Sequence, residues 1–492
     1  MILGLVVVMI FMVIYYSTGG FVADLVLLAN IFFIFGILSA WGATLTLPGL
    51  AGIVLTVGMA VDANVIIYER IREELEKGKS MIKAIADGYS NSYSAIIDAN
   101  ITTLIVAFIL NTFGLGPVRG FAVVLIIGIF SSLFTAIFLT RLIFDRWSGQ
   151  NRTIKFHSSF TERAWKNITF DFVGKRKLFY ALSGVIILAG VLSLAIGGLN
   201  LGVDFKGGRS YTVAFDKSIN AEEIRSALEK DFDPNVVVKS FSNANRLKIT
   251  TAKDINVTTA AQDSLTTASL YASLKPFYED PSLSFEGWDQ TYKEQQQKVQ
   301  ASIAQDIQRS SYIAGLLSVT GIFLYILFRF RRWQYGFGAI IALLHDVLIV
   351  IGIFSIFRNI MPFSMEIGET FIAAILTVIG YSVNDTVVVF DRIREYMRES
   401  KAGTRAEIIN SAIQSTLSRT VITSATTALT LIVLFIAGSD QIKGFAFAIL
   451  VGIVVGTYSS IFIATPIVMD FSKEGTLRDH HTASPKRAAV KA

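Results

Sequence analysis

Two carboxylates of this chain lie inside apolar segments, where they could take part in ion transfer. Asp62 stands in the run VGMAVDANVIIYERIREELEKGKS, and Asp385 stands in VIGYSVNDTVVVFDRIREYMRESKA. An ionisable side chain near the centre of a membrane-spanning helix costs about 2.5–3.5 kcal/mol on insertion scales, so that such a residue usually serves a function. Two similar segments, each with one buried acid, predict a transporter that is driven by an ion gradient.

The composition indicates that these acids belong to a polytopic α-helical membrane protein. Of the 492 residues, 52% are hydrophobic and only 17% are charged, which is unlike a soluble enzyme with a single core. A spanning helix needs about 20 mostly apolar residues. Eleven segments qualify, at approximately residues 1–16, 21–45, 49–68, 94–112, 117–144, 178–198, 312–330, 336–357, 370–390, 416–437 and 443–470.

Basic residues predict the orientation in the membrane. The stretch from Asp145 to Lys177 contains eight lysines and arginines, whereas the turns at 112–118 and 438–442 contain none. Basic loops are usually cytoplasmic, which places residues 199–311 outside the cytoplasm. The formal net charge of +6 is modest; positive loops explain it, and we expect no nucleic-acid partner.

The two membrane halves repeat each other over five spans. The matched positions include Asn30 with Asp346, Glu69 with Asp391, and Thr102-Thr103 with Thr426-Thr427. Residues 178–198 and 199–311 give the second half a sixth span and a soluble domain. Halves of six spans face the same way and form a parallel repeat about an axis along the membrane normal. We therefore expect five plus six spans, with the first half truncated by one helix and one soluble domain.

Residues 199–311 are predicted to form a small α+β domain of the ferredoxin-like kind. The pair Gly207-Gly208 suits a tight turn where the chain leaves the membrane, although an ordinary loop explains it as well. The Asn220 side chain is a helix-capping signal. The expected strands are Ser210–Phe215, Val236–Val238 and Leu247–Thr250, and the expected helices are Ala221–Lys230 and Ala260–Tyr278.

Several motifs of the chain resemble the SecD–SecF family of the bacterial protein-secretion pathway, within the resistance-nodulation-division superfamily. The resemblance covers nearly all of residues 1–472, with the motifs in the family's order. The SecD-like motifs are Gly58–Val65, Glu69–Leu75, Asp98-Ala99-Asn100 and Gly116–Phe121, and the SecF-like motifs are Gly202–Gly208, Leu344-His345-Asp346, Tyr381–Thr386 and Ser418-Arg419-Thr420.

The resemblance implies a domain organisation, a location and a set of partners. It implies a multi-pass protein of the bacterial inner membrane that uses a proton gradient to pull preproteins from the SecYEG translocon, with a YajC-like accessory subunit and membrane lipid as further partners. The implied domains are a SecD-like membrane half (1–145), a basic cytoplasmic linker (146–177), a first SecF-like span (178–198), a periplasmic domain (199–311), a SecF-like membrane half (312–472) and a disordered cytoplasmic tail (473–492).

The family's proton-relay residues correspond to Asp62, Asp385 and Arg419. Burial and a nearby guanidinium act in opposite directions on an acid, and arginine stays charged, so that Arg419 could hold one acid ionised until a conformational change separates them. Aligning the charged segments after each acid places Asp62 opposite Asn384, which makes the site asymmetric. Candidate supporting residues are Asn64, Asn384, Thr386, Thr423, Ser424, Asp98, His345 and Asp346, and candidate hinge residues are Asp204, Gly207 and Gly208.

Each of these residues also has a purely structural interpretation. Asp62 and Asp385 could stabilise helix ends, and Arg419 could extend from its helix towards the interface. His345 could be a packed histidine, and Asp98 could cap the start of a helix. Asp24 is better explained by a structural role.

The sequence argues against an enzyme that breaks covalent bonds. Gly78-Lys79-Ser80 resembles the end of a phosphate-binding loop, but Glu73 stands where that motif requires glycine. The four histidines are scattered and cysteine is absent, so no metal or cofactor is expected beyond the proton gradient. Sodium is an alternative coupling ion, because carboxylate, Asn and Thr oxygens suit either cation. The alternative functions are an exporter of small amphiphiles and a passive scaffold of the secretion complex.

Overall fold

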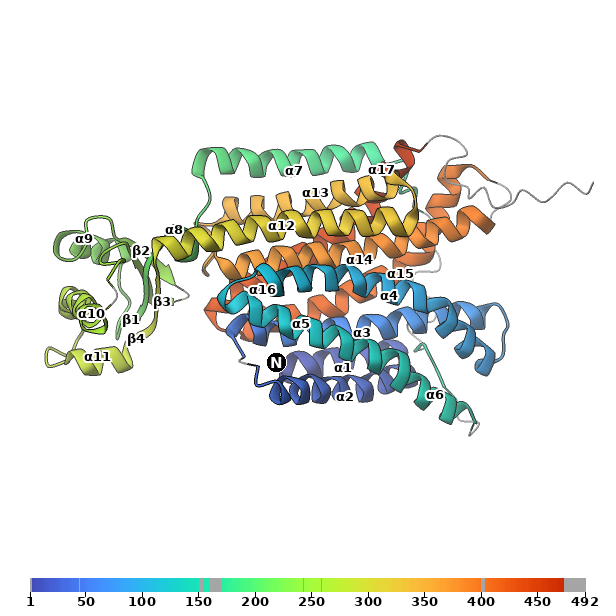
Figure 1. The fold of residues 1–492 in the computed structure, drawn as a ribbon, viewed down its shortest axis with the longest axis horizontal. Helices are drawn as coiled ribbons and strands as arrows, with labels where there is room; N and C mark the ends of the chain where they lie inside the picture. The colour runs from blue at the N-terminus through green and yellow to red at the C-terminus, as the bar shows by residue number, and fades with distance from the viewer. Residues whose placement is uncertain are drawn as a thin grey trace, which may run out of the picture.

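The computed structural model shows a bundle of long helices with a small α/β domain at one end (Figure 1). It describes residues 2–43, 45–149, 154–158, 161, 170–241, 243–257, 259–399 and 403–472. Within these residues, 10 helices are long and apolar enough to cross a membrane, and Ile2–Tyr16 is a shorter apolar helix. The predicted polytopic architecture is therefore confirmed, with 15 residues in the first apolar helix.

The first half contains seven helical elements. They are α1 (Ile2–Tyr16), α2 (Thr18–Ala40), α3 (Leu47–Glu76), α4 (Met81–Phe113), α5 (Gly116–Phe134), the π-helix η1 (Thr135–Leu139) and α6 (Thr140–Gly149). The second half begins with α7 (Arg176–Gly197), which lies at the edge of the bundle in Figure 1. It continues after the soluble domain with α12 (Ala301–Phe330), α13 (Trp333–Phe357), α14 (Glu369–Glu399), α15 (Arg405–Ala437), α16 (Asp440–Ser459), the π-helix η3 (Ser460–Ala464) and α17 (Thr465–Asp470).

Several helices extend well beyond their apolar segments. Helix α4 begins at Met81 instead of residue 94, α12 at Ala301 instead of 312, and α15 at Arg405 instead of 416. Hydrophobicity identifies only the part of a helix that lies in lipid, whereas backbone hydrogen bonds continue for as long as the local sequence supports them. In α15, the start is fixed by a capping box, in which Thr404 and Glu407 each bond the other's backbone.

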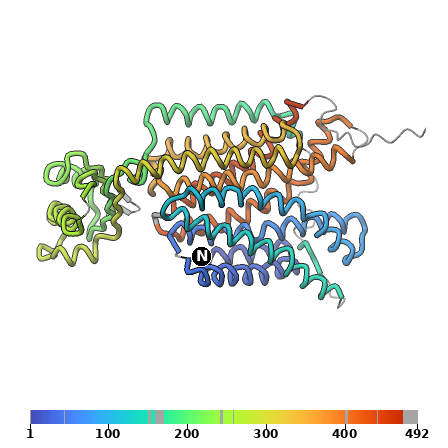
Figure 2. The backbone as a smooth tube through the Cα atoms, in the orientation of Figure 1, coloured from blue at the N-terminus to red at the C-terminus, as the bar shows by residue number. Residues whose placement is uncertain are grey.

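The two halves have the same arrangement and lie side by side (Figure 2). Helix α3 of the first half packs on α15 of the second, and α14 of the second half packs on α4 of the first. The π-helices η1 and η3 also occupy equivalent places: η1 directly follows α5, and η3 directly follows α16. Such segments are rare, so their recurrence supports the parallel repeat that the sequence predicts.

Helices α3 and α15 approach each other closely at a glycine. A β-carbon on Gly58 would lie 2.9 Å from Thr427 Cα and 3.0 Å from Thr430 Oγ1. Small residues allow this kind of approach between membrane helices. The contact lies one helical turn from Asp62, so the same glycine sets the spacing of the two halves beside the buried acid.

We expect Gly58→Ala to destabilise the bundle by about 1–3 kcal/mol, because the added methyl group must push α3 and α15 apart. The matched control is Gly36→Ala in α2, where a β-carbon would have no neighbour within 4 Å. That change should leave the stability equal or slightly higher, since alanine favours a helix. Thermal unfolding of the two variants in detergent measures the difference; equal melting temperatures would contradict a tight contact at Gly58.

The soluble domain has the βαββαβ order of a ferredoxin-like fold, and its four strands are arranged β2-β3-β1-β4, all antiparallel. One face of the sheet carries α9 and α10, whose apolar residues form the domain core around Trp288. Its elements are α8 (Val203–Lys206), β1 (Gly208–Ala214), α9 (Ala221–Asp231), β2 (Val237–Phe241), β3 (Asn243–Thr251), α10 (Ala260–Leu274), the 3-10 helix η2 (Lys275–Phe277), α11 (Phe285–Thr291) and β4 (Lys293–Val299).

The sequence predicted three strands and two helices of this domain, but not its last strand or the short helices α8 and α11. The Asn220 side chain caps α9 by accepting a hydrogen bond from the Glu222 backbone, as expected. Strand β4 reads KEQQQKV, in which Val299 is the one residue of the β-branched and aromatic types that indicate strands. It forms because its backbone pairs with β1 at the edge of the sheet, where charged and polar side chains discourage pairing with other chains.

The predicted linker is partly folded against the first half. Phe156 is buried, with its ring 5.3 Å from Tyr68 and 5.2 Å from Phe144. Thr161 donates a hydrogen bond to the Tyr15 carbonyl. The basic composition gave no indication of this packing. Much of the linker, and the tail predicted for residues 473–492, lie outside the described residues.

Candidate ion-relay site

The two predicted acids lie on the two most enclosed helices of the bundle. Asp62 on α3 is 5% exposed and Asp385 on α14 is 6% exposed. Of the apolar stretch of each helix, 89% is buried inside the protein. Each of the two helices packs against helices of its own half and against a helix of the other half. Both acids are therefore shielded from lipid and lie at the interface between the repeats.

Arg419 lies between the two acids. It is on α15, which packs against both α3 and α14, and it interacts electrostatically with Asp385 and Asp62. The two acids also interact with each other. Two carboxylates and one guanidinium are electrically neutral when one acid carries a proton, and an uncompensated buried charge is costly. The cluster is therefore suited to hold one exchangeable proton.

Hydroxyl groups complete the surroundings of the acids. Ser424 donates a 3.4 Å hydrogen bond to Asp385 Oδ2, and the Thr426 hydroxyl lies beside Asp62. The Tyr381 ring is close to both acids, and its hydroxyl donates to Thr427 Oγ1 at 3.3 Å. Sequence reasoning missed Tyr381 and Thr426 as site residues, because their relevance depends on which way the helices face each other.

The predicted supporting residues divide into two groups. Asn64 and Asn384 each have a buried side-chain oxygen without a hydrogen-bond partner among the described residues, as does Asp62 at Oδ1. The two amide oxygens can accept a hydrogen bond from a water molecule, and the carboxylate oxygen of Asp62 can also accept a proton. Thr386 and Thr423 instead donate to carbonyls of their own helices, at 3.2 and 3.1 Å, so their hydroxyl protons are already used.

A ring of four charged residues joins the halves at the end of the bundle opposite the soluble domain. Arg70 bonds Glu73 at 2.7 Å and Glu395 at 2.9 Å, and Arg392 bonds Glu395 at 2.9 Å and Glu73 at 2.8 Å. Two of these contacts join residues three apart on one helix, and the other two cross the repeat interface. The ring and Arg419 line one cavity of about 60 Å³, which extends from Arg419 towards this end of the bundle.

We expect the ring to stabilise the contact between the halves. A double-mutant cycle of Arg70→Ala and Glu395→Ala should give a coupling energy of about 1 kcal/mol, because the pair is half-buried and part of a network. The control cycle is Arg225→Ala with Glu222→Ala, an exposed pair on α9 that should couple by less than about 0.5 kcal/mol. Unfolding measurements on each variant give both energies. Equal coupling in the two cycles would show that the ring adds nothing to the interface.

Asp98 is not a helix cap. Helix α4 starts at Met81, so Asp98 lies well inside the helix, where it accepts hydrogen bonds from Arg329 at 2.7 Å and Tyr325 at 2.7 Å. The capping interpretation was wrong because the polar first turns of α4 do not look like a membrane helix. Asp98 instead ties α4 of the first half to α12 of the second half.

His345 and Asp346 form a separate buried cluster within the second half. His345 Nδ1 is 2.9 Å from Asp346 Oδ1, and Nε2 is 3.0 Å from Ser183 Oγ. Asp346 Oδ2 also accepts hydrogen bonds from Ser382 at 2.5 Å and Ser459 at 2.9 Å. The cluster adjoins the relay through Ser382, which lies one turn from Asp385 on α14.

The predicted hinge residues connect the soluble domain to α14. Gly207 and Gly208 have φ angles of 72° and 139°, which other residues rarely adopt. Asp204 accepts hydrogen bonds from Gln297 of β4 at 2.6 Å and from the backbone N–H of Glu369 at 3.0 Å. The start of the helix that carries Asp385 is therefore bound directly to the domain.

Comparison with known proteins identifies relatives of nearly the whole chain. Residues 1–150 and 283–474 match the family described as protein export membrane protein SecD/SecF, C-terminal, and residues 192–219 match the SecD/SecF GG motif. The protein translocase subunit SecDF of Bacillus subtilis is 37% identical over 95% of this chain. The subunit SecF of Rhodothermus marinus is 41% identical over 64% of this chain and 97% of its own length.

A solved structure has the same fold. The crystal structure of SecDF from Thermus thermophilus, described as a translocon-associated membrane protein, superposes with a TM-score of 0.82 at 34% identity and covers 95% of this chain. The present chain spans 61% of that protein and 62% of the Bacillus subtilis relative.

Proposed function

Since this chain belongs to the SecD/SecF family of protein export membrane proteins, we propose that it uses the proton-motive force to assist the transport of preproteins across the inner membrane. The observation that carries the proposal is the cluster of Asp62, Asp385 and Arg419 at the interface of the two halves. The proposed partners are the SecYEG translocon, a YajC-like subunit and the preprotein. The relatives are translocase subunits, and we propose no bond-breaking activity for this chain.

In this mechanism, Arg419 decides which acid is ionised. A proton enters the cluster and neutralises one carboxyl group while Arg419 stays paired with the other. A shift of α15 relative to α3 and α14 transfers the guanidinium to the protonated acid and favours release of its proton on the opposite side. Moving one charge across 100 mV supplies about 2.3 kcal/mol, which is enough to bias a movement of the halves and of the soluble domain bound to α14.

Proton flux through the purified chain in liposomes tests this proposal. Under a pH gradient, with a clamped membrane potential, an entrapped pH dye should report flux above that of protein-free liposomes. Replacing sodium by potassium on both sides should leave the flux unchanged if the coupling ion is the proton, and should abolish transport if it is sodium. An absence of flux with either cation would contradict the proposal and favour a scaffold, whereas efflux of a fluorescent amphiphile would favour an exporter.

A further inference from the structure

A further buried acid lies at the end of the bundle that faces the soluble domain. Glu369 is the first residue of α14 and is 8% exposed, and its Oε1 atom has no hydrogen-bond partner among the described residues. Its carboxyl group lies beside the backbone N–H of Val118 near the start of α5. Glu369 belongs to the second half and contacts the first half, so it lies at the interface between the halves, as Asp62 and Asp385 do.

The local backbone leaves room for this carboxyl group. Gly116 has a φ angle of 49°, and a β-carbon there would lie only 3.5 Å from each carboxyl oxygen of Glu369. A larger residue at this position would strain the backbone, and its β-carbon would be in van der Waals contact with the acid. Gly116 therefore lies directly against the carboxyl group of Glu369.

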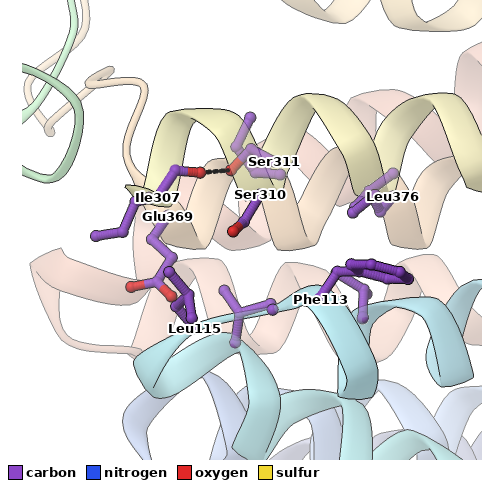
Figure 3. A pocket seen from close by; sticks show the side chains of 12 residues that line it. Phe113, Leu115, Ile307, Ser310, Ser311, Glu369 and Leu376 are labelled. Atoms are coloured by element: carbon purple, nitrogen blue, oxygen red, sulfur yellow. Dashed lines mark hydrogen bonds between the residues drawn. The ribbon is translucent and has the colours of Figure 1, made fainter. Parts of the chain in front are cut away.

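Cavities lie on both sides of Glu369. On one side, a cavity of about 280 Å³ separates the open face of the sheet from the bundle, and Glu369 lines it with Asp204, Lys248 and Glu366. On the other side is a small apolar pocket between α4, α5, α12 and α14 (Figure 3). In Figure 3 the Glu369 carboxyl group points towards Leu115, while Ser310 and Ser311 lie farther along the pocket. Glu369 thus lies between the larger polar cavity and the small apolar pocket of the bundle.

The charges around Glu369 favour proton uptake. Its charged neighbour is another acid, Asp204 on α8, and Lys248 is paired with Glu366 at 2.5 Å. No described residue of α4, α5 or α12 that lines the apolar pocket is charged. Since a buried carboxylate without a cation is costly, Glu369 is suited to bind a proton that reaches it through the larger cavity.

We propose that Glu369 is the proton-loading group of the relay on the side of the soluble domain. It takes a proton from the cavity beneath the sheet and passes it along α14 towards Asp385. Sixteen residues of helix separate the two acids, or about 24 Å. The buried hydroxyls of Thr377 and Tyr381 lie between them in the helix and donate to backbone carbonyls at 2.7 and 3.2 Å, so the proposed transfer requires water molecules between the acids. This inference rests on the proposed function. It also gives the soluble domain a direct influence on loading, because Asp204 binds both β4 and the first residue of α14.

Proton flux in liposomes, driven from the side of the soluble domain, tests the inference. We expect Glu369→Gln to reduce the flux by about 10²-fold, which is typical for loss of a proton-transfer group, while Glu369→Asp keeps a carboxyl group and much of the flux. The control is Glu294→Gln, which removes an acid of β4 that pairs with Arg246 and does not line the cavity, and which should leave the flux unchanged. The variant Asp385→Asn reports separately on the proposed function.

Infrared difference spectroscopy tests proton binding without reference to flux. Acidification should produce a carboxylic-acid band in the wild-type protein that is missing in Glu369→Gln, present in Glu294→Gln and shifted in Glu369→Asp. If Asp385→Asn stops the flux while Glu369→Gln does not, or if the band persists in Glu369→Gln, the loading role is wrong and the relay stands. If Asp385→Asn has no effect, the proposed function itself fails.

Discussion

Asp385→Asn is expected to reduce proton flux through the reconstituted protein by about 10²–10⁴-fold, the usual contribution of a positioned proton-transfer group. Asparagine has nearly the shape of the acid and can still accept the hydrogen bond from Ser424, but it cannot bind and release a proton. The folded structure should persist, because a neutral amide replaces a buried carboxyl group. A pH dye inside the liposomes measures the flux, and the melting temperature monitors folding.

Asp24→Asn is the matched control for this experiment. Asp24 is also an acid within a membrane helix and is only 4% exposed, but it lies on α2, away from the interface between the halves. Its replacement should leave proton flux unchanged. Equal flux in wild type and Asp385→Asn would remove Asp385 from the relay and favour a scaffold, in which the buried acids are structural. A loss of flux in both variants would instead indicate a general effect of removing buried acids.

Arg419→Met is expected to reduce the flux to the level of Asp385→Asn, for a different reason. Without the guanidinium, the cluster is electrically neutral only when both acids are protonated, so that neither proton is readily released. Methionine fills a similar volume, and the neutral acids keep the cost in stability small. The variant Arg419→Lys retains the charge on a side chain of different geometry and should keep part of the flux.

The pair of Arg419 variants separates the relay from a structural role. If Arg419 only extended towards the interface, methionine and lysine would both leave the flux near that of the wild type, and lysine would be fully equivalent. A large loss with methionine and a partial loss with lysine would require a cation at this position. Infrared bands of protonated carboxyl groups should also be stronger in Arg419→Met than in the wild type at neutral pH, which a purely structural residue would not produce.

The asymmetry of the cluster follows from the repeat itself. Each half supplies one acid, but the alignment of the charged segments places Asp62 opposite Asn384, and Arg419 comes from the second half alone. The ring of Arg70, Glu73, Arg392 and Glu395 is by contrast symmetric across the halves. The symmetric ring makes equivalent contacts when the two halves exchange places, whereas the asymmetric cluster does not.

The sequence by itself determined the features that depend on neighbouring residues. Apolar segments predicted the membrane helices, and the Asn220 cap and the strand pattern predicted most of the soluble domain. Asp62 and Asp385 were identified because each is an acid within a repeated apolar segment. The sequence did not predict the polar first turns of α4, which do not resemble a membrane helix, or strand β4, which forms by pairing with β1.

Only the tertiary structure decided which distant residues meet. The hydrogen bonds of Asp98 to Arg329 and of Arg70 to Glu395 join the two halves. The sequence near either partner does not indicate these contacts, because they depend on how the helices cross and which faces they present. The acids could therefore be found from the chain alone, whereas their partners follow from the packing of the two repeats.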